Sequence, residues 1–374
     1  FNQWRRRELS LANRGLHIDF YNLSEHVIIN LQDKVKSQEN DYIVDVALSS
    51  DEKQLALVTS SSKTLLIFNL DDLVVIKSFE LPKTASRIRF TPESKKILVA
   101  DKNGDVLLYD LKSDEGGTKI LGHLSLLLDV LQTSDEKFII SSDRDEKIKV
   151  SCYPHTYNIH SYCLGHTEFV NHLELLPHNI ELLTSTSGDG TIKFWKYTEG
   201  KLLYTIDTTQ DIKEIRILED FAKVMDNEGV EVNKLPIVLY TVSVLNDNTS
   251  LLVVSLHNYN DLLLYSLTTE NTKINHKLEY RLTLKESPAA VKFYNSNLYV
   301  YDDIKSEVII FNVTNTESAY NLCEQSRINM FTDKVDTVNS SETTGKFIRA
   351  LYKRKFDNVQ EYLKRKMLRL EKKI

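Results

Sequence analysis

The sequence is poor in the residues that organise small, cross-linked or loop-rich domains. Its 374 residues include three cysteines, six prolines and eleven glycines. The cysteines, Cys152, Cys163 and Cys323, are odd in number and form no Cys-x-x-Cys pair. This usage argues against a disulfide framework or a zinc module and fits a reducing compartment.

Membrane and enzyme signatures are also missing. No run of about 18 apolar residues occurs, which predicts that no helix spans a membrane. There is no G-x-S-x-G elbow, Walker loop or H-E-x-x-H motif. The spacing of His155, His160, His172 and His178 matches no usual ligand pattern. We therefore predict a protein without catalytic residues, bound metal or cofactor of its own.

What the sequence does contain is a repeat. Each copy reads as a strand, a polar turn, a small-residue strand, a second polar turn and an aliphatic strand that mostly ends in an aromatic residue. Most gaps between the ends of successive copies are 38 to 46 residues, the period of propeller blades. The copies end at Asn30, Phe68, Tyr109, Ser151, Trp195, Tyr265 and Phe311.

The repeat predicts an all-β, seven-bladed propeller over residues 1–345, because one blade cannot bury both of its faces without neighbours. Runs such as LLIF are apolar at consecutive positions, as burial on two sides requires. The bounds of the first and last blades stay open. A polar stretch, Thr198 to Leu235, separates the fifth copy from the sixth.

Two copies differ in an informative way. STSGDGTIKFW (185–195) and the preceding Gly165-His166 resemble a WD-repeat blade. With Asp189 in the turn and Trp195 at the strand end, His166 resembles the histidine of the structural hydrogen-bond tetrad of such blades. SSDRDEKIKVS (141–151) instead has four charges in its turn and Ser151 in the place of the Trp. We assign structural roles to His123, His166, Asp189 and Trp195.

Residues 346–374 form a basic tail with eleven Lys and Arg against three acidic residues, on a body that carries a balance of −14. Apolar residues recur at helical spacing from Phe356 to Ile374, which predicts a C-terminal basic amphipathic helix. Such a helix can pack on the propeller as a solvated element, or it can meet nucleic-acid phosphates. Calmodulin-like or membrane-surface binding is a less favoured alternative.

These residues together resemble one WD-repeat family. LGHLSLLLDV (121–130), SSDRDEKIKVS, CLGHTEFV (163–170), STSGDGTIKFW and LYKRKFDNVQEYLKRK (351–366) are similar to the non-catalytic subunit of eukaryotic tRNA (guanine-N7-)-methyltransferase. The resemblance covers roughly residues 85–197 and 346–370.

The resemblance implies a heterodimer with a separate catalytic subunit that holds S-adenosylmethionine and methylates a guanine in the tRNA variable loop. It implies partner contacts at Lys149 and its neighbours in the charged repeat, and RNA contacts in the tail. Strand alternation separately predicts that Lys147, Lys149 and Ser151 share one face. The expected partner-binding residues are Arg144, Asp145, Glu146, Lys147 and Lys149. The expected RNA-binding residues are Lys353, Arg354, Lys355, Lys364, Arg365, Lys366 and Arg369.

A general protein-interaction propeller is the alternative, for example a ubiquitin-ligase substrate adaptor or a chromatin-associated scaffold. It explains the repeats and the missing chemistry equally well, but it does not predict the charged repeat and the basic tail together. The family resemblance also implies residence in the nucleus, with the cytoplasm left open. No membrane partner is expected.

Overall fold

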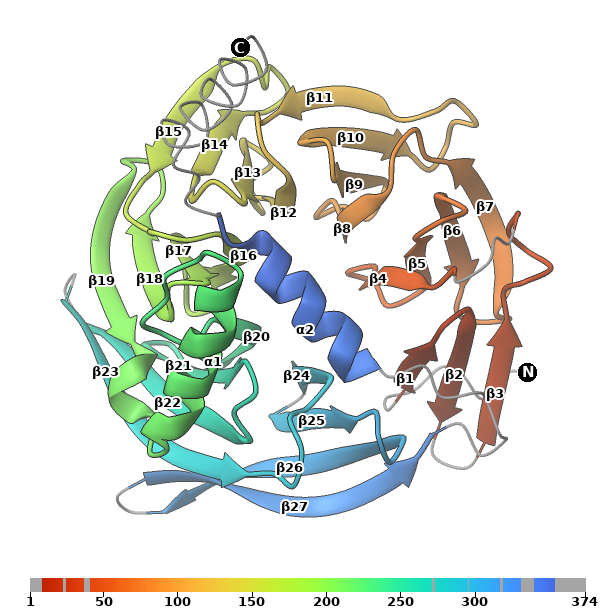
Figure 1. The fold of residues 1–374 in the computed structure, drawn as a ribbon. Helices are drawn as coiled ribbons and strands as arrows, with labels where there is room; N and C mark the ends of the chain where they lie inside the picture. The colour runs from red at the N-terminus through yellow and green to blue at the C-terminus, as the bar shows by residue number, and fades with distance from the viewer. Residues whose placement is uncertain are drawn as a thin grey trace, which may run out of the picture.

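The chain folds into a ring of antiparallel sheets (Figure 1). The computed structural model describes residues 9–22, 25–36, 41–270, 273–294, 296–316, 319–330 and 340–353. Within these ranges six sheets have four strands and the N-terminal sheet has three. Strands follow one another in sequence order within every sheet, so each sheet is a simple meander.

The strands have the following bounds. The N-terminal sheet comprises β1 (Leu9–Arg14), β2 (His17–Asn22) and β3 (Glu25–Asn30). The next two sheets comprise β4 (Ile43–Leu48), β5 (Gln54–Thr59), β6 (Thr64–Asn69), β7 (Val74–Glu80), β8 (Ala85–Phe90), β9 (Lys96–Asp101), β10 (Asp105–Asp110) and β11 (Thr118–Gly122). Two more comprise β12 (Leu127–Gln132), β13 (Phe138–Asp143), β14 (Ile148–Cys152), β15 (Ile159–Cys163), β16 (Val170–Leu176), β17 (Asn179–Ser187), β18 (Thr191–Lys196) and β19 (Lys201–Asp207). The last two comprise β20 (Ile237–Asn246), β21 (Thr249–Leu256), β22 (Asp261–Glu270), β23 (Lys273–Thr283), β24 (Ala290–Tyr294), β25 (Asn297–Asp302), β26 (Glu307–Thr316) and β27 (Ala319–Asn329).

The predicted all-β propeller is confirmed. Every predicted end of a copy falls inside the third strand of a sheet, from Asn30 in β3 to Phe311 in β26. The predicted number of blades was seven. Within the described residues six sheets are complete four-stranded blades, and the N-terminal sheet has three strands. The segment 319–329 forms β27, so it completes the last sheet rather than the first.

Successive residues of one strand enter different cores, which explains the unbroken apolar runs. In β5, Ala56 and Val58 pack in the cluster shared with the β8–β11 sheet. Leu57, between them, packs instead with Ile18 and Phe20 of the N-terminal sheet. Because side chains alternate between the two faces of a strand, a sheet covered on both sides needs apolar residues at every position.

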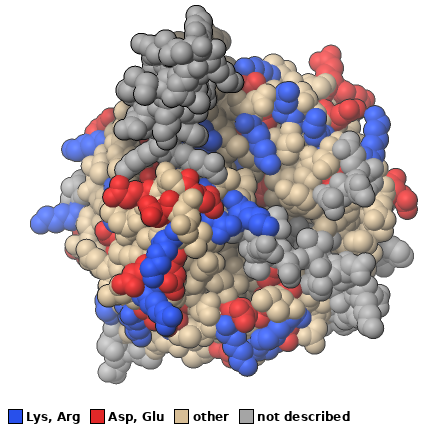
Figure 2. Space-filling model, in the orientation of Figure 1, with Lys and Arg blue, Asp and Glu red and all other residues tan. Residues whose placement is uncertain are grey.

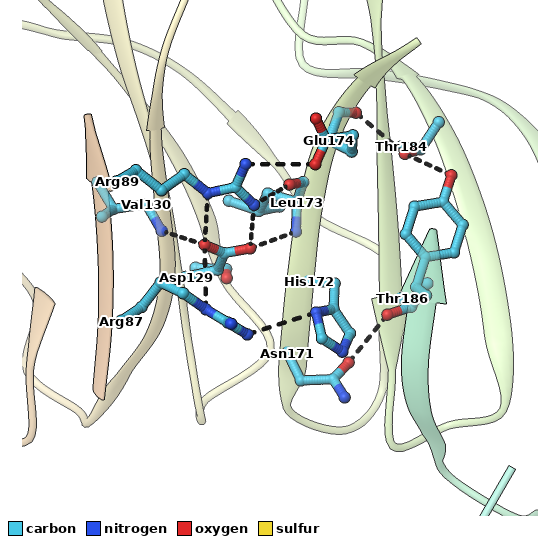
Figure 3. Close-up of polar contacts among 12 residues, drawn as sticks. Arg87, Arg89, Asp129, Val130, Asn171, His172, Leu173, Glu174, Thr184 and Thr186 are labelled. Atoms are coloured by element: carbon cyan, nitrogen blue, oxygen red, sulfur yellow. Dashed lines mark hydrogen bonds and ion pairs between the residues drawn. The ribbon is translucent and has the colours of Figure 1, made fainter. Parts of the chain in front are cut away.

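A buried carboxylate joins three neighbouring blades near the centre of the ring (Figure 3). Asp129 of β12 is fully buried and accepts bonds from Arg89 Nη2 of β8 (2.9 Å) and from the Leu173 backbone N–H of β16 (2.8 Å). Burial alone would raise the pKa of Asp129, but the charges of Arg89 and Arg87 outweigh it and lower the pKa. The carboxylate therefore stays ionised and ties the three innermost strands together.

His172 carries this polar contact to the next sheet. Its Nε2 lies 2.9 Å from the Val238 carbonyl oxygen of β20, and its Nδ1 lies 3.4 Å from Nη2 of Arg87. Burial, helped by the charge of Arg87, lowers the pKa of His172 to about 4. The ring is thus neutral near pH 7, with Nε2–H donating to the carbonyl and Nδ1 accepting from the guanidinium.

Within the described residues two α-helices accompany the ring (Figure 1). The polar stretch predicted between the fifth and sixth copies contains β19, the short 3₁₀ helix Thr208–Asp211 and α1 (Ile215–Asn227). The helix α2 (Ser340–Leu351) crosses the centre of the ring and spans the predicted domain boundary at residue 345. Neither helix, nor any other in the described part of the chain, has the length and apolar character needed to cross a membrane.

Replacing Asp129 tests the contact between blades. Asp129→Ala should lower the free energy of unfolding by about 3–5 kcal/mol, because the largely covered Arg89 guanidinium and the Leu173 backbone N–H would both lose the buried carboxylate that binds them. The matched control is Asp114→Ala, since the side chain of Asp114 is 92% exposed. Both variants are compared by urea unfolding, and equal midpoints would contradict the role given to Asp129.

Candidate partner-binding surface

The blade β16–β19 holds a complete hydrogen-bond tetrad. His166 Nδ1 lies 2.9 Å from Asp189 Oδ2, and His166 Nε2 lies 2.8 Å from Ser185 Oγ. Trp195 Nε1 donates to the same Ser185 Oγ at 2.8 Å. Burial lowers the pKa of His166, so a neutral ring donates to Asp189 and accepts from Ser185. His166, Asp189 and Trp195 thus occupy the structural positions that the sequence pattern predicts.

The blade β12–β15 has a different arrangement around His123. Its Nδ1 lies 2.9 Å from Asp143 Oδ2 and its Nε2 lies 2.8 Å from Ser141 Oγ. Ser151 pairs with Ile139 just as Trp195 pairs with Leu183, so Ser151 does occupy the Trp position. The Ser151 hydroxyl is buried and makes no hydrogen bond. The hydrogen-bonded set in this blade therefore ends at Ser141 and has no fourth member.

The acid that binds the histidine occupies a different strand position in each of the two blades. By the strand register, Asp143 is equivalent to Ser187, since each faces the first residue of its inner strand. Asp145 is consequently the counterpart of Asp189, the acid that binds His166. Because Asp143 makes the bond to His123, Asp145 lies outside the tetrad, with a side chain that is 28% exposed.

We call residues 144–147 the charged turn. Asp143 holds this turn, because its Oδ1 accepts from the backbone N–H groups of Asp145 (2.9 Å) and Lys147 (3.0 Å). Burial raises the pKa of Asp143, but bonds from His123 and the Lys147 N–H lower it further than burial raises it. Glu146 has φ of +65°, where the equivalent residue in the next blade is Gly190. A non-glycine residue there costs about 1 kcal/mol, so the turn keeps its glutamate despite strain.

Lys149, one of the expected partner-binding residues, lies on a strand face that the structure covers. The residue is only 7% exposed, and its Nζ donates to the Gly122 carbonyl oxygen at 2.5 Å. Burial lowers the pKa of the ammonium group. Ser151 is fully buried as well. The alternation of side chains was predicted correctly, but the face shared by Lys149 and Ser151 is covered; of the expected partner-binding residues, Arg144 to Lys147 remain accessible.

An apolar residue that the sequence did not single out lies next to the charged turn. Leu124 follows His123 and is fully exposed. The backbone N–H of Arg144 donates to the Leu126 carbonyl oxygen at 2.9 Å, which brings the loop of Leu124 beside the turn. A single exposed leucine is common on a protein surface, so Leu124 is of interest only because it lies beside the charged turn. Its exposure could not be read from the sequence.

The start of the tail lies against the charged turn. Nζ of Lys353 is 2.5 Å from Glu146 Oε1 and 3.6 Å from Asp145 Oδ1. The face that carries α2 shows acidic and basic side chains intermixed (Figure 2). Of the expected RNA-binding residues only Lys353 is described; the predicted helix from 356 to 374 and the others lie outside the described residues. Those others are Arg354, Lys355, Lys364, Arg365, Lys366 and Arg369.

A polar pocket of about 280 Å³ lies beside Tyr352, between the β16–β19 blade and the loop after α1. Its ionisable residues are engaged in structural bonds. Asp189 binds His166, Lys193 Nζ lies 3.3 Å from Thr205 Oγ1, and Lys234 Nζ lies 2.6 Å from Asp207 Oδ2. The described residues also contain no group of three or more His, Cys, Asp and Glu that could hold a metal ion.

The family model for the tRNA methyltransferase TRM82 WD40 domain matches residues 8–117 and 112–318. A tRNA (guanine-N(7)-)-methyltransferase non-catalytic subunit, wuho of Drosophila pseudoobscura pseudoobscura, is 31% identical over 344 residues, or 88% of this chain and 78% of that protein. The WDR4 subunit of Xenopus laevis is 31% identical over 90% of this chain and 82% of its own length. The wuho protein of Drosophila mojavensis is 44% identical, but the chain spans only 42% of its length.

Solved structures resemble the chain in fold. A chain of the Mitotic Checkpoint Complex superposes with a TM-score of 0.62 at 11% identity, covering 79% of this chain and 81% of its own. The Cps50 (Swd1) β-propeller domain of Myceliophteria thermophila gives 0.56 at 10% identity, covering 78% and 91%. At such low identity these likenesses establish a WD40-type propeller and nothing about activity.

Proposed function

The chain belongs to the family of WD-repeat non-catalytic subunits of tRNA (guanine-N(7)-)-methyltransferase, and from this premise we propose that its propeller binds a separate catalytic subunit. That subunit would hold S-adenosylmethionine and form N7-methylguanosine in the variable loop of tRNA. Family membership favours this function over a general adaptor or scaffold. The two proteins would act as a heterodimer.

The charged turn is the observation that supports this function. Its second acid, Asp145, lies outside the tetrad, because Asp143 binds His123 in its place. Mixed charges set the register of a complex and speed its formation, and the exposed Leu124 beside them supplies an apolar contact.

We propose that Lys149 positions the partner-binding surface rather than contacting the partner. Because its ammonium group is committed to the Gly122 carbonyl, it holds the loop that precedes Leu124. Its reversal to glutamate would put a carboxylate against a carbonyl oxygen and disturb the blade itself. The partner contact is therefore tested better at Arg144 and Lys147.

The ring itself would act as the rigid support of this surface. We propose that the three-stranded sheet β1–β3 counts as the seventh blade. Ile18 and Phe20 share a core with the β4–β7 sheet, and Tyr21 packs against Val308 and Ile310 of the last sheet. The N-terminal sheet thus has apolar contacts with both of its neighbours.

The tail would extend the RNA-binding surface of the catalytic subunit. Its eleven basic residues suit contacts with the tRNA backbone, which position an RNA without reading its sequence. The basic clusters, together with family membership, also support our proposal that the protein resides in the nucleus, with the cytoplasm left open.

Reversing the two cations of the charged turn tests the partner contact. Arg144→Glu with Lys147→Glu should weaken binding to the catalytic subunit about tenfold, mainly through slower association, because complementary charges steer the encounter. Binding is measured by calorimetry and stopped-flow mixing at two salt concentrations.

The matched control is Lys137→Glu. Lys137 lies in the β12–β13 turn, at the opposite end of the same blade, and its side chain is 72% exposed. This control should bind like the unchanged chain. Equal affinity of the control and the double variant would remove the charged turn from the interface.

Neutralising the tail tests the RNA contact. Lys364, Arg365, Lys366 and Arg369 are replaced together by glutamine in the assembled heterodimer. The affinity for tRNA should fall, and the slope of log affinity against log salt should flatten by about 3, because fewer counterions are released on binding. An unchanged slope, measured by fluorescence anisotropy, would exclude these residues from the RNA contact.

A further inference from the structure

The end of α2 is fixed to three separate parts of the ring. Nε of Arg349 lies 3.3 Å from Glu228 Oε1, at the end of α1. The Tyr352 hydroxyl donates to the Gly188 carbonyl oxygen of the β17–β18 turn at 2.8 Å. Lys353 then pairs with the charged turn of the preceding blade. We call residues 349–353 the C-terminal clasp.

Apolar packing gives the clasp its position. Ile348, Leu351 and Tyr352 are buried in one cluster with Phe169 and Phe221. The ring of Tyr352 meets that of Phe169 edge-on, with centroids 5.1 Å apart and planes at 86°. Figure 1 shows α2 ending beside β16, next to the blade that carries the charged turn. The course of the chain from Tyr352 to Lys353 is therefore set by the core, not by the ion pair.

The ion pair of Lys353 adds little to the stability of the fold. The side chain of Lys353 is 44% exposed, and those of Asp145 and Glu146 are 28% and 32% exposed. Burial opposes the charge of Lys353, but bonds and charges from Glu146 and Asp145 raise its pKa overall. Half-exposed pairs of this kind contribute little to folding. Their main effect is on the charge of the surface around them.

That effect is a change in the balance of the charged turn. Arg144 and Lys147 alone equal Asp145 and Glu146 in number, and Lys353 tips the sum to positive. Arg144 Nε lies 3.8 Å from Asp145 Oδ1, whereas among the described residues Glu146 forms an ion pair with Lys353 alone. A partner that covered the turn without Lys353 would therefore bury Glu146 unpaired, which is costly. With Lys353 in place both acids already have a partner before the interface closes.

We propose that the C-terminal clasp is part of the partner-binding surface, with Lys353 completing the charged turn so that the catalytic subunit meets a preformed, net-positive face. This inference rests on the proposed function. Coupling is reciprocal, so a partner that binds better to the clasped turn must also hold the clasp more firmly. The clasp thereby aligns the start of the basic tail with the bound catalytic subunit.

The test uses the full chain and the catalytic subunit. Lys353→Glu should weaken binding about fivefold, Lys353→Arg should bind nearly as the unchanged chain, and Lys353→Glu with Glu146→Lys should recover most of the loss. Lys137→Glu is again the control for charge reversal. Hydrogen exchange of residues 340–352 should slow when the partner binds the unchanged chain, and slow less with Lys353→Glu.

The outcomes separate the two proposals. If the unchanged chain does not bind the catalytic subunit, the proposed function and the inference that rests on it both fail. If the unchanged chain binds and Lys353→Glu binds equally well or better, the inference is wrong while the proposed function stands.

Discussion

The carboxylate of Asp129 is the interaction on which the centre of the ring depends. It lies at a point where three innermost strands meet, and it is satisfied by a guanidinium from one neighbouring blade and a backbone amide from the other. Apolar burial between blades supplies most of the stability, but it has no direction. The buried acid adds direction, because its hydrogen bonds fix the height of each innermost strand relative to the next. The faces of the ring, and the turns they carry, are placed as a result.

A change in the polar bonds of one blade explains how it exposes the charges that we propose to bind the partner. The β16–β19 blade uses Asp189, His166, Ser185 and Trp195 to close its turn. The β12–β15 blade closes its turn with Asp143 instead, which sets Asp145 free. An edited structural repeat can thus present charges without losing the bonds that hold its shape, and the C-terminal clasp reaches those charges from the far end of the chain.

Much of this arrangement could be predicted from the sequence, and the limits have physical causes. The third strands, the Gly165-His166 pair and the Ser151 substitution could be recognised because strand period and turn residues are local signals. The burial of Lys149 could not be predicted, because alternation tells which residues share a strand face but not whether another element covers that face. The helix α2 and its contacts with Glu228, Gly188 and Glu146 join residues more than 100 positions apart, and no local pattern encodes such contacts.

The most direct test of the account is an omission assay. The chain, the catalytic subunit from the same source, S-adenosylmethionine and tRNA are combined, and N7-methylguanosine is quantified with each component left out in turn. The account predicts sustained methylation only when both proteins are present, and none from this chain with S-adenosylmethionine and tRNA alone. Methylation by the catalytic subunit that is unchanged when this chain is omitted would contradict it.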